Sequence, residues 1–220
     1  MREAVERLTA AATRLALPSG SALRIVPVTA AAGPVPETLR SAAPRRRNTF
    51  AAGRRAAAEA LAAAGSAGAE VGIGPDGLPL WPEGWMGSIT HTDDIAAALV
   101  MRAAPGAVLG LDLEAMMTPD LARDIAPEIM PEGLSGVMPP ELEVTRAFSA
   151  KEALYKALYP ATRQFRDFHA AVIGWDGSRL TLAEDWGADW PAGRVLPVRQ
   201  VVAGGHVLSV VWDGRRGVRT

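Results

Sequence analysis

The sequence has 220 residues, of which 49% are hydrophobic and 21% charged, so it can form one globular domain or two small ones with a substantial core. The formal net charge of −1 excludes a general attraction to nucleic acid or anionic membranes, and the absence of cysteine excludes disulfides, thiolate metal sites and a cysteine nucleophile. The sequence has no run of about 18 apolar residues and begins with charged ones. We therefore expect no membrane span and no signal peptide, and by default a cytoplasmic protein.

The first half of the chain is expected to contain two helices and several strands. Apolar residues at helical spacing predict an amphipathic helix over residues 2–16, and the apolar run at 23–28 predicts a strand. Good helix formers predict a second helix over residues 45–64, and a loop rich in glycine and proline covers 72–87. Further strands are expected at residues 87–90, 95–102 and 107–113.

The second half begins with a helix start at Thr118-Pro119-Asp120, where the proline occupies the first turn. Residues 140–159 form the strongest helical pattern in the chain. Four strands are expected after it, at residues 170–175, 179–183, 194–202 and 207–212. We predict an α+β protein of two parts, residues 1–105 and 106–220, with no internal repeat in the sequence.

The helix over 140–159 holds both lysines of the chain, whereas the other 21 basic residues are arginines. Lys151 and Lys156 flank Glu152, and a compact lysine ammonium suits phosphate oxygens and proton transfer. Glu152 shares one helical stripe with aromatic residues, which is unusual for a merely solvated carboxylate. The alternative is a simple i,i+4 ion pair between Glu152 and Lys156, which does not explain Lys151.

Two more carboxylates lie in the run Gly110-Leu111-Asp112-Leu113-Glu114. In a strand, Asp112 and Glu114 point to the same side, about 6–7 Å apart, and repel each other unless a cation lies between them. Hard oxygen ligands suit Mg²⁺. With Glu152 they suggest a three-carboxylate metal site beside a lysine, which is chemistry for moving a phosphate-containing group. The alternative is a strand end that faces solvent.

A basic cluster at residues 45–55 could bind phosphate. On a helix Arg46, Phe50 and Arg54 align at i, i+4 and i+8, and guanidinium groups bind phosphate in bidentate fashion. The alternative is a solvated helix face, and a nucleic-acid surface is disfavoured by the short patch and the net charge. The segment 72–77 matches G-x-G-x-x-G, but prolines forbid the helix that a dinucleotide fold requires there, so we expect a tight turn.

His91 has the most polar setting of the three histidines, at the end of Gly87-Ser88-Ile89-Thr90 and before Thr92-Asp93-Asp94. It could donate to a phosphate or join Asp93 as a metal ligand. A purely structural histidine is the alternative.

Four segments, in this order, resemble the 4′-phosphopantetheinyl transferases of the surfactin/enterobactin type. They are Arg46-Arg47-x-x-Phe50-x-x-Gly53-Arg54, Trp81-Pro82-x-Gly84-x-x-Gly87-Ser88-Ile89-Thr90-His91, Gly110-Leu111-Asp112-Leu113-Glu114, and Phe148-Ser149-Ala150-Lys151-Glu152-x-x-x-Lys156. The resemblance implies two similar α+β halves, with the active site in the cleft between them. It also implies a monomer that transfers the 4′-phosphopantetheine arm of coenzyme A to a serine of an apo acyl or peptidyl carrier protein. The reaction requires Mg²⁺ and releases 3′,5′-ADP; which carrier and which pathway, siderophore biosynthesis or another, stays open.

The resemblance also implies roles for individual residues. Asp112, Glu114 and Glu152 would hold Mg²⁺, and Glu152 would orient or deprotonate the carrier serine. The remaining residues would bind coenzyme A. His91 and Lys156 would contact its phosphates, and Lys151 would assist them. Arg46 and Arg54 would bind the 3′-phosphate, and Arg47 and Thr92 would lie beside them.

Residues 71–77 lack the lysine that relatives often carry before the tryptophan–proline turn. Either this chain binds coenzyme A more weakly than those relatives, or one of Arg45, Arg47 and Arg55 replaces the missing lysine. Two other functions remain open: a non-catalytic coenzyme A or nucleotide-binding module, and a metal-dependent phosphohydrolase that uses His91, Asp93 and Asp112.

Overall fold

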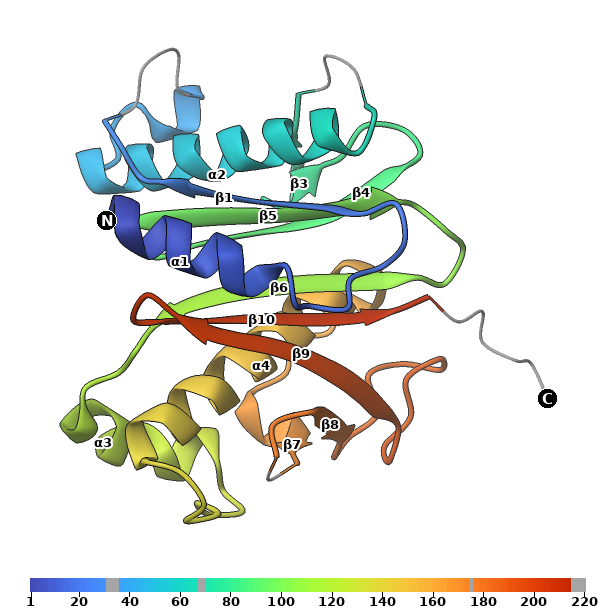
Figure 1. Cartoon of the computed structure of the whole chain (residues 1–220). Coiled ribbons are helices and arrows are strands. Elements are labelled where there is room, and N and C mark those ends of the chain that lie inside the picture. The colour runs from blue at the N-terminus through green and yellow to red at the C-terminus, as the bar shows by residue number, and fades with distance from the viewer. Residues whose placement is uncertain (31–35, 67–69, 175, 215–220) are drawn as a thin grey trace.

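The computed structural model describes residues 1–30, 36–66, 70–174 and 176–214 (Figure 1). Its helices and strands, in chain order, are α1 (Arg2–Ala12), β1 (Ala22–Pro27), the 3₁₀ turn η1 (Glu37–Leu39), α2 (Pro44–Ala63), β2 (Gly72–Ile73), β3 (Pro79–Leu80), β4 (Trp85–His91), β5 (Ile95–Arg102), β6 (Val108–Ala115), α3 (Pro119–Ile129), α4 (Pro140–Thr162), η2 (Phe168–Ala170), β7 (Ala171–Ile173), β8 (Arg179–Leu182), β9 (Val195–Ala203) and β10 (His206–Asp213). Across these residues, no helix combines the length and the apolar character needed to span a bilayer.

Two antiparallel sheets divide the molecule into two parts. The first has the strand order β1-β5-β4 and carries α2, and the second has the order β6-β10-β9-β8-β7 and carries α4. Figure 1 shows α2 above the first sheet and α4 below the second, with β6 and β10 near the middle. The predicted α+β class with two halves, each made of helices and antiparallel strands, is confirmed.

The predicted elements differ from the structure at a few ends. The first helix stops at Ala12 rather than residue 16, because the Thr13 hydroxyl donates to the Ala10 carbonyl and competes with the helical backbone. The predicted loop at 72–87 contains the small β2–β3 hairpin, whose turn uses Gly77 at a φ of 80°. The expected strand at 170–175 ends at Ile173 as β7, and residue 175 lies outside the described residues.

The two sheets meet at two edge strands, β4 and β6. Each has a hydrogen-bonded strand neighbour on one side only, so β6 presents unpaired backbone groups toward β4. The hydroxyl of Ser88 accepts from the Leu111 N–H at 2.9 Å, and that of Thr90 accepts from the Leu113 N–H at 3.1 Å. Two buried β4 hydroxyls thus satisfy the edge of β6 and fix the register between the halves.

Helix α1 packs on both halves, since it contacts β1 of the first sheet and β9 of the second. Its fully buried Leu8 belongs to a core cluster that includes Leu99 from β5, Leu111 from β6 and Leu208 from β10. The apolar residues of β6 therefore face this shared core, and its carboxylates face the other way.

Gly110 lets α4 approach β6 closely. A Cβ added at Gly110 would lie 1.9 Å from the Ala153 carbonyl oxygen and 2.6 Å from the Ala157 backbone nitrogen. Because alternate residues of a strand share a face, Gly110 lies on the same side as Asp112 and Glu114. The missing side chain at Gly110 thus sets how near α4 comes to the two carboxylates.

Replacing Gly110 with alanine should lower the free energy of unfolding by about 3 kcal/mol, because the added methyl meets backbone atoms that cannot rotate away. Urea unfolding followed by tryptophan fluorescence measures the change. Gly72→Ala is the matched control, since its Cβ would meet only Leu80, at 3.6 Å, and should cost less than about 1 kcal/mol. Equal stability of Gly110→Ala and the wild type would show that α4 does not depend on this close approach.

Candidate active site at the junction of the halves

Helix α4 carries Glu152 and Lys156 to the carboxylate face of β6. Lys156 Nζ lies 2.5 Å from Asp112 Oδ1, and the Asp112 side chain is only 2% exposed. Glu152 is one turn earlier on the same side of the helix, and its charge interacts with both Lys156 and Asp112. Lys156 thus forms its ion pair with Asp112 of β6 rather than the i,i+4 pair with Glu152 that was the alternative interpretation.

Thr90 connects this ion pair to the first half of the molecule. Its hydroxyl donates to Asp112 Oδ1 at 3.2 Å and accepts from Lys156 Nζ at 3.2 Å, while also accepting from the Leu113 N–H. Sequence reasoning gave Thr90 no role. The available signal was the spacing of Ser88 and Thr90, which places two hydroxyls on one face of the same strand.

The carboxylates repel one another in a partly dry setting. Burial, with the nearby charge of Asp112, raises the pKa of Glu114 to about 7. Burial also raises the pKa of Glu152, and the charge of Lys156 offsets part of that effect. Asp112 Oδ2 is buried and has no hydrogen-bond partner. Three acidic side chains therefore share a site in which negative charge is only partly compensated.

This arrangement fits a hard divalent cation. Asp112 offers an unused buried oxygen, and Glu114 and Glu152 offer carboxylates whose charged forms are disfavoured until positive charge arrives. Within the described ranges, however, no three histidine, aspartate or glutamate side chains already form a cluster that could hold a metal. The three residues are near neighbours electrostatically, and holding an ion would require their side chains to converge.

His91 and Arg46 lie next to this group. Arg46 Nη1 is 3.5 Å from His91 Nε2, which joins the start of α2 to the end of β4. Partial burial lowers the pKa of His91, and the charges of Arg46 and Lys156 lower it further. A neutral imidazole next to the Arg46 guanidinium offers hydrogen-bond donors to an anionic ligand.

Arg54 lies about two turns after Arg46 on α2. It donates to the Gly72 carbonyl at 3.1 Å, and its guanidinium carbon lies 4.8 Å from the centre of the Phe50 ring. Its Nε is buried without a partner, and burial lowers its pKa. Arg47 instead donates to the carbonyls of Arg40 and Ala42, ahead of α2.

The other residues proposed for coenzyme A have internal partners as well. The Thr92 hydroxyl accepts from two N–H groups of the β4–β5 turn, those of Asp94 and Ile95. Arg45 is ion-paired with Asp93, and Arg55 donates to the Pro27 carbonyl at 2.5 Å. Asp93 is thus held by α2 rather than joined to His91 as a ligand.

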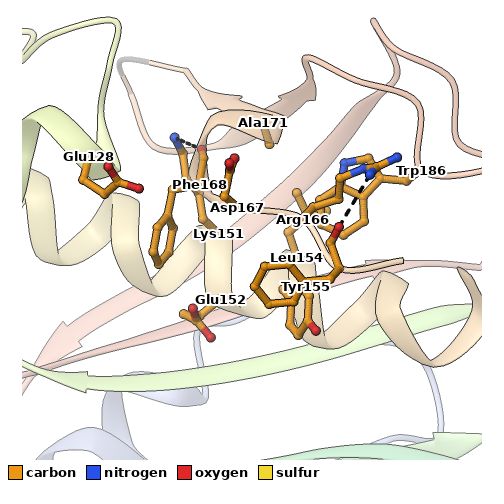
Figure 2. A pocket seen from close by; sticks show the side chains of 11 residues that line it. Glu128, Lys151, Glu152, Leu154, Tyr155, Arg166, Asp167, Phe168, Ala171 and Trp186 are labelled. Atoms are coloured by element: carbon orange, nitrogen blue, oxygen red, sulfur yellow. Dashed lines mark hydrogen bonds between the residues drawn. The ribbon is translucent and has the colours of Figure 1, made fainter. Parts of the chain in front are cut away.

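The structure does not bring Lys151 to the other site residues. Its side chain is buried, and its Nζ donates to the carbonyls of Ile129 at 2.6 Å and Phe168 at 2.8 Å. Figure 2 shows Lys151 and Glu152 leaving α4 in different directions, with Lys151 joined to Phe168. Lys151 therefore holds the end of α3 and the turn η2 against α4.

Two cavities adjoin the acidic group on the α4 side, in addition to one of about 450 Å³ that Glu114 lines together with His91 and Thr92. One, of about 230 Å³, lies beside Glu152 and has aromatic walls from Tyr155, Phe165, Phe168 and Trp186 (Figure 2). The other, of about 330 Å³, lies between the halves and is lined by apolar residues of the β3–β4 segment, β6 and the end of α4. Lys156 lines this second cavity, so a ligand there would reach the ion pair with Asp112.

Comparison with known proteins matches both halves to one family. The profile of the 4′-phosphopantetheinyl transferase N-terminal domain matches residues 35–101, and that of the 4′-phosphopantetheinyl transferase superfamily matches residues 108–211. Enterobactin synthase component D of Salmonella typhi is 36% identical over 150 residues, which cover 66% of this chain and 58% of that protein. The 4′-phosphopantetheinyl transferase Npt of Nocardia iowensis is 33% identical over 187 residues, which cover 78% of this chain and 77% of that protein.

The match to a second enterobactin synthase component D, from Salmonella typhimurium, covers 52% of that protein, so the chain spans about half the length of these Salmonella relatives. The 4′-phosphopantetheinyl transferase PptT of Mycobacterium tuberculosis is 33% identical over 150 residues, covering 60% of this chain and 63% of that protein. The family resemblance drawn from four sequence segments is confirmed by these matches.

The raised pKa of Glu114 predicts how stability depends on pH. The folded chain keeps the Glu114 proton up to a pKa of about 7, against 4.5 ordinarily, so the native state loses stability as the pH rises between those values. Glu114→Gln cannot lose a proton. In EDTA, its melting temperature should therefore rise relative to wild type as the pH goes from 5 to 8, as measured by scanning calorimetry.

Glu59→Gln on the surface of α2 is the control, and the difference of its melting temperature from wild type should not change over the same range. Mg²⁺ should raise the melting temperature of the wild type at pH 8 and have less effect on Glu114→Gln. A difference between Glu114→Gln and wild type that stays constant from pH 5 to 8 would contradict the raised pKa.

Proposed function

The chain belongs to the 4′-phosphopantetheinyl transferase superfamily, of the surfactin/enterobactin type, and from that premise we propose that it transfers the 4′-phosphopantetheine arm of coenzyme A to a serine of an apo carrier protein. The observation that carries the proposal is the junction of Thr90, Asp112 and Lys156, with Glu114 and Glu152 beside it. It combines an unsatisfied oxygen of Asp112 and two further carboxylates with an ammonium group, which is what a magnesium–diphosphate substrate requires.

In the proposed reaction, the carrier serine Oγ forms a bond to the phosphorus that bears the pantetheine arm. The bond from that phosphorus to the bridging oxygen breaks, and 3′,5′-ADP leaves with the electron pair. The serine proton goes to Glu152, whose pKa is raised by burial, which makes its carboxylate a better proton acceptor than an exposed one. Lys156 stabilises negative charge on the phosphate oxygens.

Asp112, Glu114 and Glu152 would hold Mg²⁺, and the ion would supply charge neutralisation for the diphosphate. Lys156 already neutralises one oxygen of Asp112, and Thr90 orients the same oxygen, so the second oxygen remains for a ligand. One oxygen of Asp112 would thus bind Lys156 and the other would bind the cation. This arrangement would keep the Lys156 ammonium next to the diphosphate that the cation binds.

Coenzyme A would lie across the junction of the halves. His91, Arg46 and Arg54 would bind the phosphates of the nucleotide end, and Arg47 and Thr92 would hold the start of α2 and the β4–β5 turn in place for them. The apolar cavity between the halves suits the flat adenine base, and the aromatic cavity beside Glu152 suits the pantetheine arm.

Lys151 enters this proposal as a positioning residue. Its two hydrogen bonds hold the wall of the aromatic cavity next to Glu152. We further propose that the halves divide at residues 105 and 106, which the two profile matches support, and that the enzyme works as a monomer in the cytoplasm, where coenzyme A and carrier proteins occur.

Intact mass spectrometry tests the proposed function. An apo acyl or peptidyl carrier protein is incubated with the protein, coenzyme A and Mg²⁺, and a parallel sample contains EDTA. Gain of one phosphopantetheine, about 340 Da, that disappears with EDTA supports transfer and its need for a divalent ion. No gain on acyl and peptidyl carriers, with coenzyme A still bound, would favour a non-catalytic binding module instead.

Glu152→Gln should lower the transfer rate by a factor on the order of 10²–10⁴, because the amide cannot accept the serine proton. Coenzyme A binding, measured by calorimetry, should stay close to wild type. Glu141→Gln, in the first turn of the same helix, is the control and should transfer at the wild-type rate. Wild-type transfer by Glu152→Gln would rule out its role as base.

Arg54→Ala should raise the KM for coenzyme A about tenfold or more and the KM for dephospho-coenzyme A much less, because only the former carries the 3′-phosphate. Arg55→Ala is the matched control: Arg55 is the next residue of α2, but it donates to the Pro27 carbonyl. An equal rise for both substrates would exclude Arg54 from the 3′-phosphate site.

A further inference from the structure

An ion pair joins the two halves at a place that the proposed chemistry does not use. Arg163, directly after α4, donates to Asp76 in the turn of the β2–β3 hairpin, 87 positions away in the sequence. Asp76 is fixed within its own turn, because Oδ1 accepts from the Leu78 N–H at 3.1 Å while Oδ2 accepts from Arg163. The pair therefore links two well-defined elements.

Arg163 has an unusual backbone. Its φ is 56°, and among the described residues it is the non-glycine residue with a positive φ. It ends α4 in the left-handed conformation, where its N–H donates to the Tyr159 carbonyl at 2.8 Å. Glycine takes this position in many helices without strain. An arginine here accepts some backbone strain and places a guanidinium next to the hairpin.

The two linked elements form facing walls of the cavity between the halves. Leu78, Pro79 and Trp81 line it from the hairpin side, and Tyr159 and Pro160 line it from α4. The guanidinium carbon of Arg163 also lies 6.0 Å from the centre of the Tyr159 ring. The ion pair therefore connects the two elements that carry these walls.

We propose that Asp76 and Arg163 are positioning residues that set the spacing of these walls around the adenine base of coenzyme A. The inference rests on the proposed function, which places the base in this cavity. The hairpin has no basic residue before Trp81; it contributes the carboxylate of the pair, and the guanidinium comes from the other half.

Asp76→Asn and Arg163→Gln test the pair. The asparagine can still accept from the Leu78 N–H, so Asp76→Asn removes the charge and keeps the turn. Both side chains are partly exposed, so each variant should raise the KM for coenzyme A about two- to fivefold and leave kcat unchanged. Arg163→Lys keeps the positive charge and should retain a KM close to wild type, which a purely backbone role of residue 163 does not predict.

Arg123→Gln, which breaks an exposed ion pair with Asp120 inside α3, is the control and should keep the wild-type KM. If the wild type transfers and both single variants keep its KM, the positioning role is overturned while the function stands. If the wild type transfers to no carrier, the function fails, and titration of 3′,5′-ADP by calorimetry tests the pair alone. Two- to fivefold weaker binding by both variants would support the positioning role, and unchanged binding would overturn it.

Discussion

The site depends on the contact between two edge strands that belong to different sheets. Unpaired N–H groups of β6 would be costly if they were buried without partners, and the hydroxyls of Ser88 and Thr90 on β4 satisfy them. Side-chain hydroxyls thus form, between the two sheets, the hydrogen bonds that backbone carbonyls form within a sheet. Because the partner atoms are few and directional, the halves have one preferred register, and the acidic face of β6 meets the end of β4 in that register.

The same contact tunes the chemistry of the site. A lysine and an aspartate removed from water lose hydration, and the loss is offset only when each finds well-placed partners. Here Lys156 has Asp112 and Thr90, whereas the second oxygen of Asp112 has none. Asp112 therefore keeps one oxygen available for a cation, while the Lys156 ammonium lines the cavity between the halves.

Much of this could be predicted from the sequence because it follows from local periodicity. The period of two along β6 places Asp112 and Glu114 together, and a helix turn places Glu152 above Lys156. The same geometry argues that Lys151 does not share the site with Lys156, because five residues at 100° each leave the two lysines about 140° apart around the helix. The same period of two places Ser88 and Thr90 on one face of β4, but the partners of Thr90 on β6 and α4 could not be predicted, because they lie in segments distant in the sequence. The ion pair of Asp76 with Arg163 is hidden for the same reason.

The most direct test of the central claim is a crystal structure with coenzyme A and Mn²⁺, in which anomalous scattering locates the metal. The account predicts one anomalous peak among the carboxylates of Asp112, Glu114 and Glu152, with diphosphate oxygens between it and Lys156. A metal bound at His91 and Asp93, or a diphosphate that lies away from the junction of β4 and β6, would contradict it.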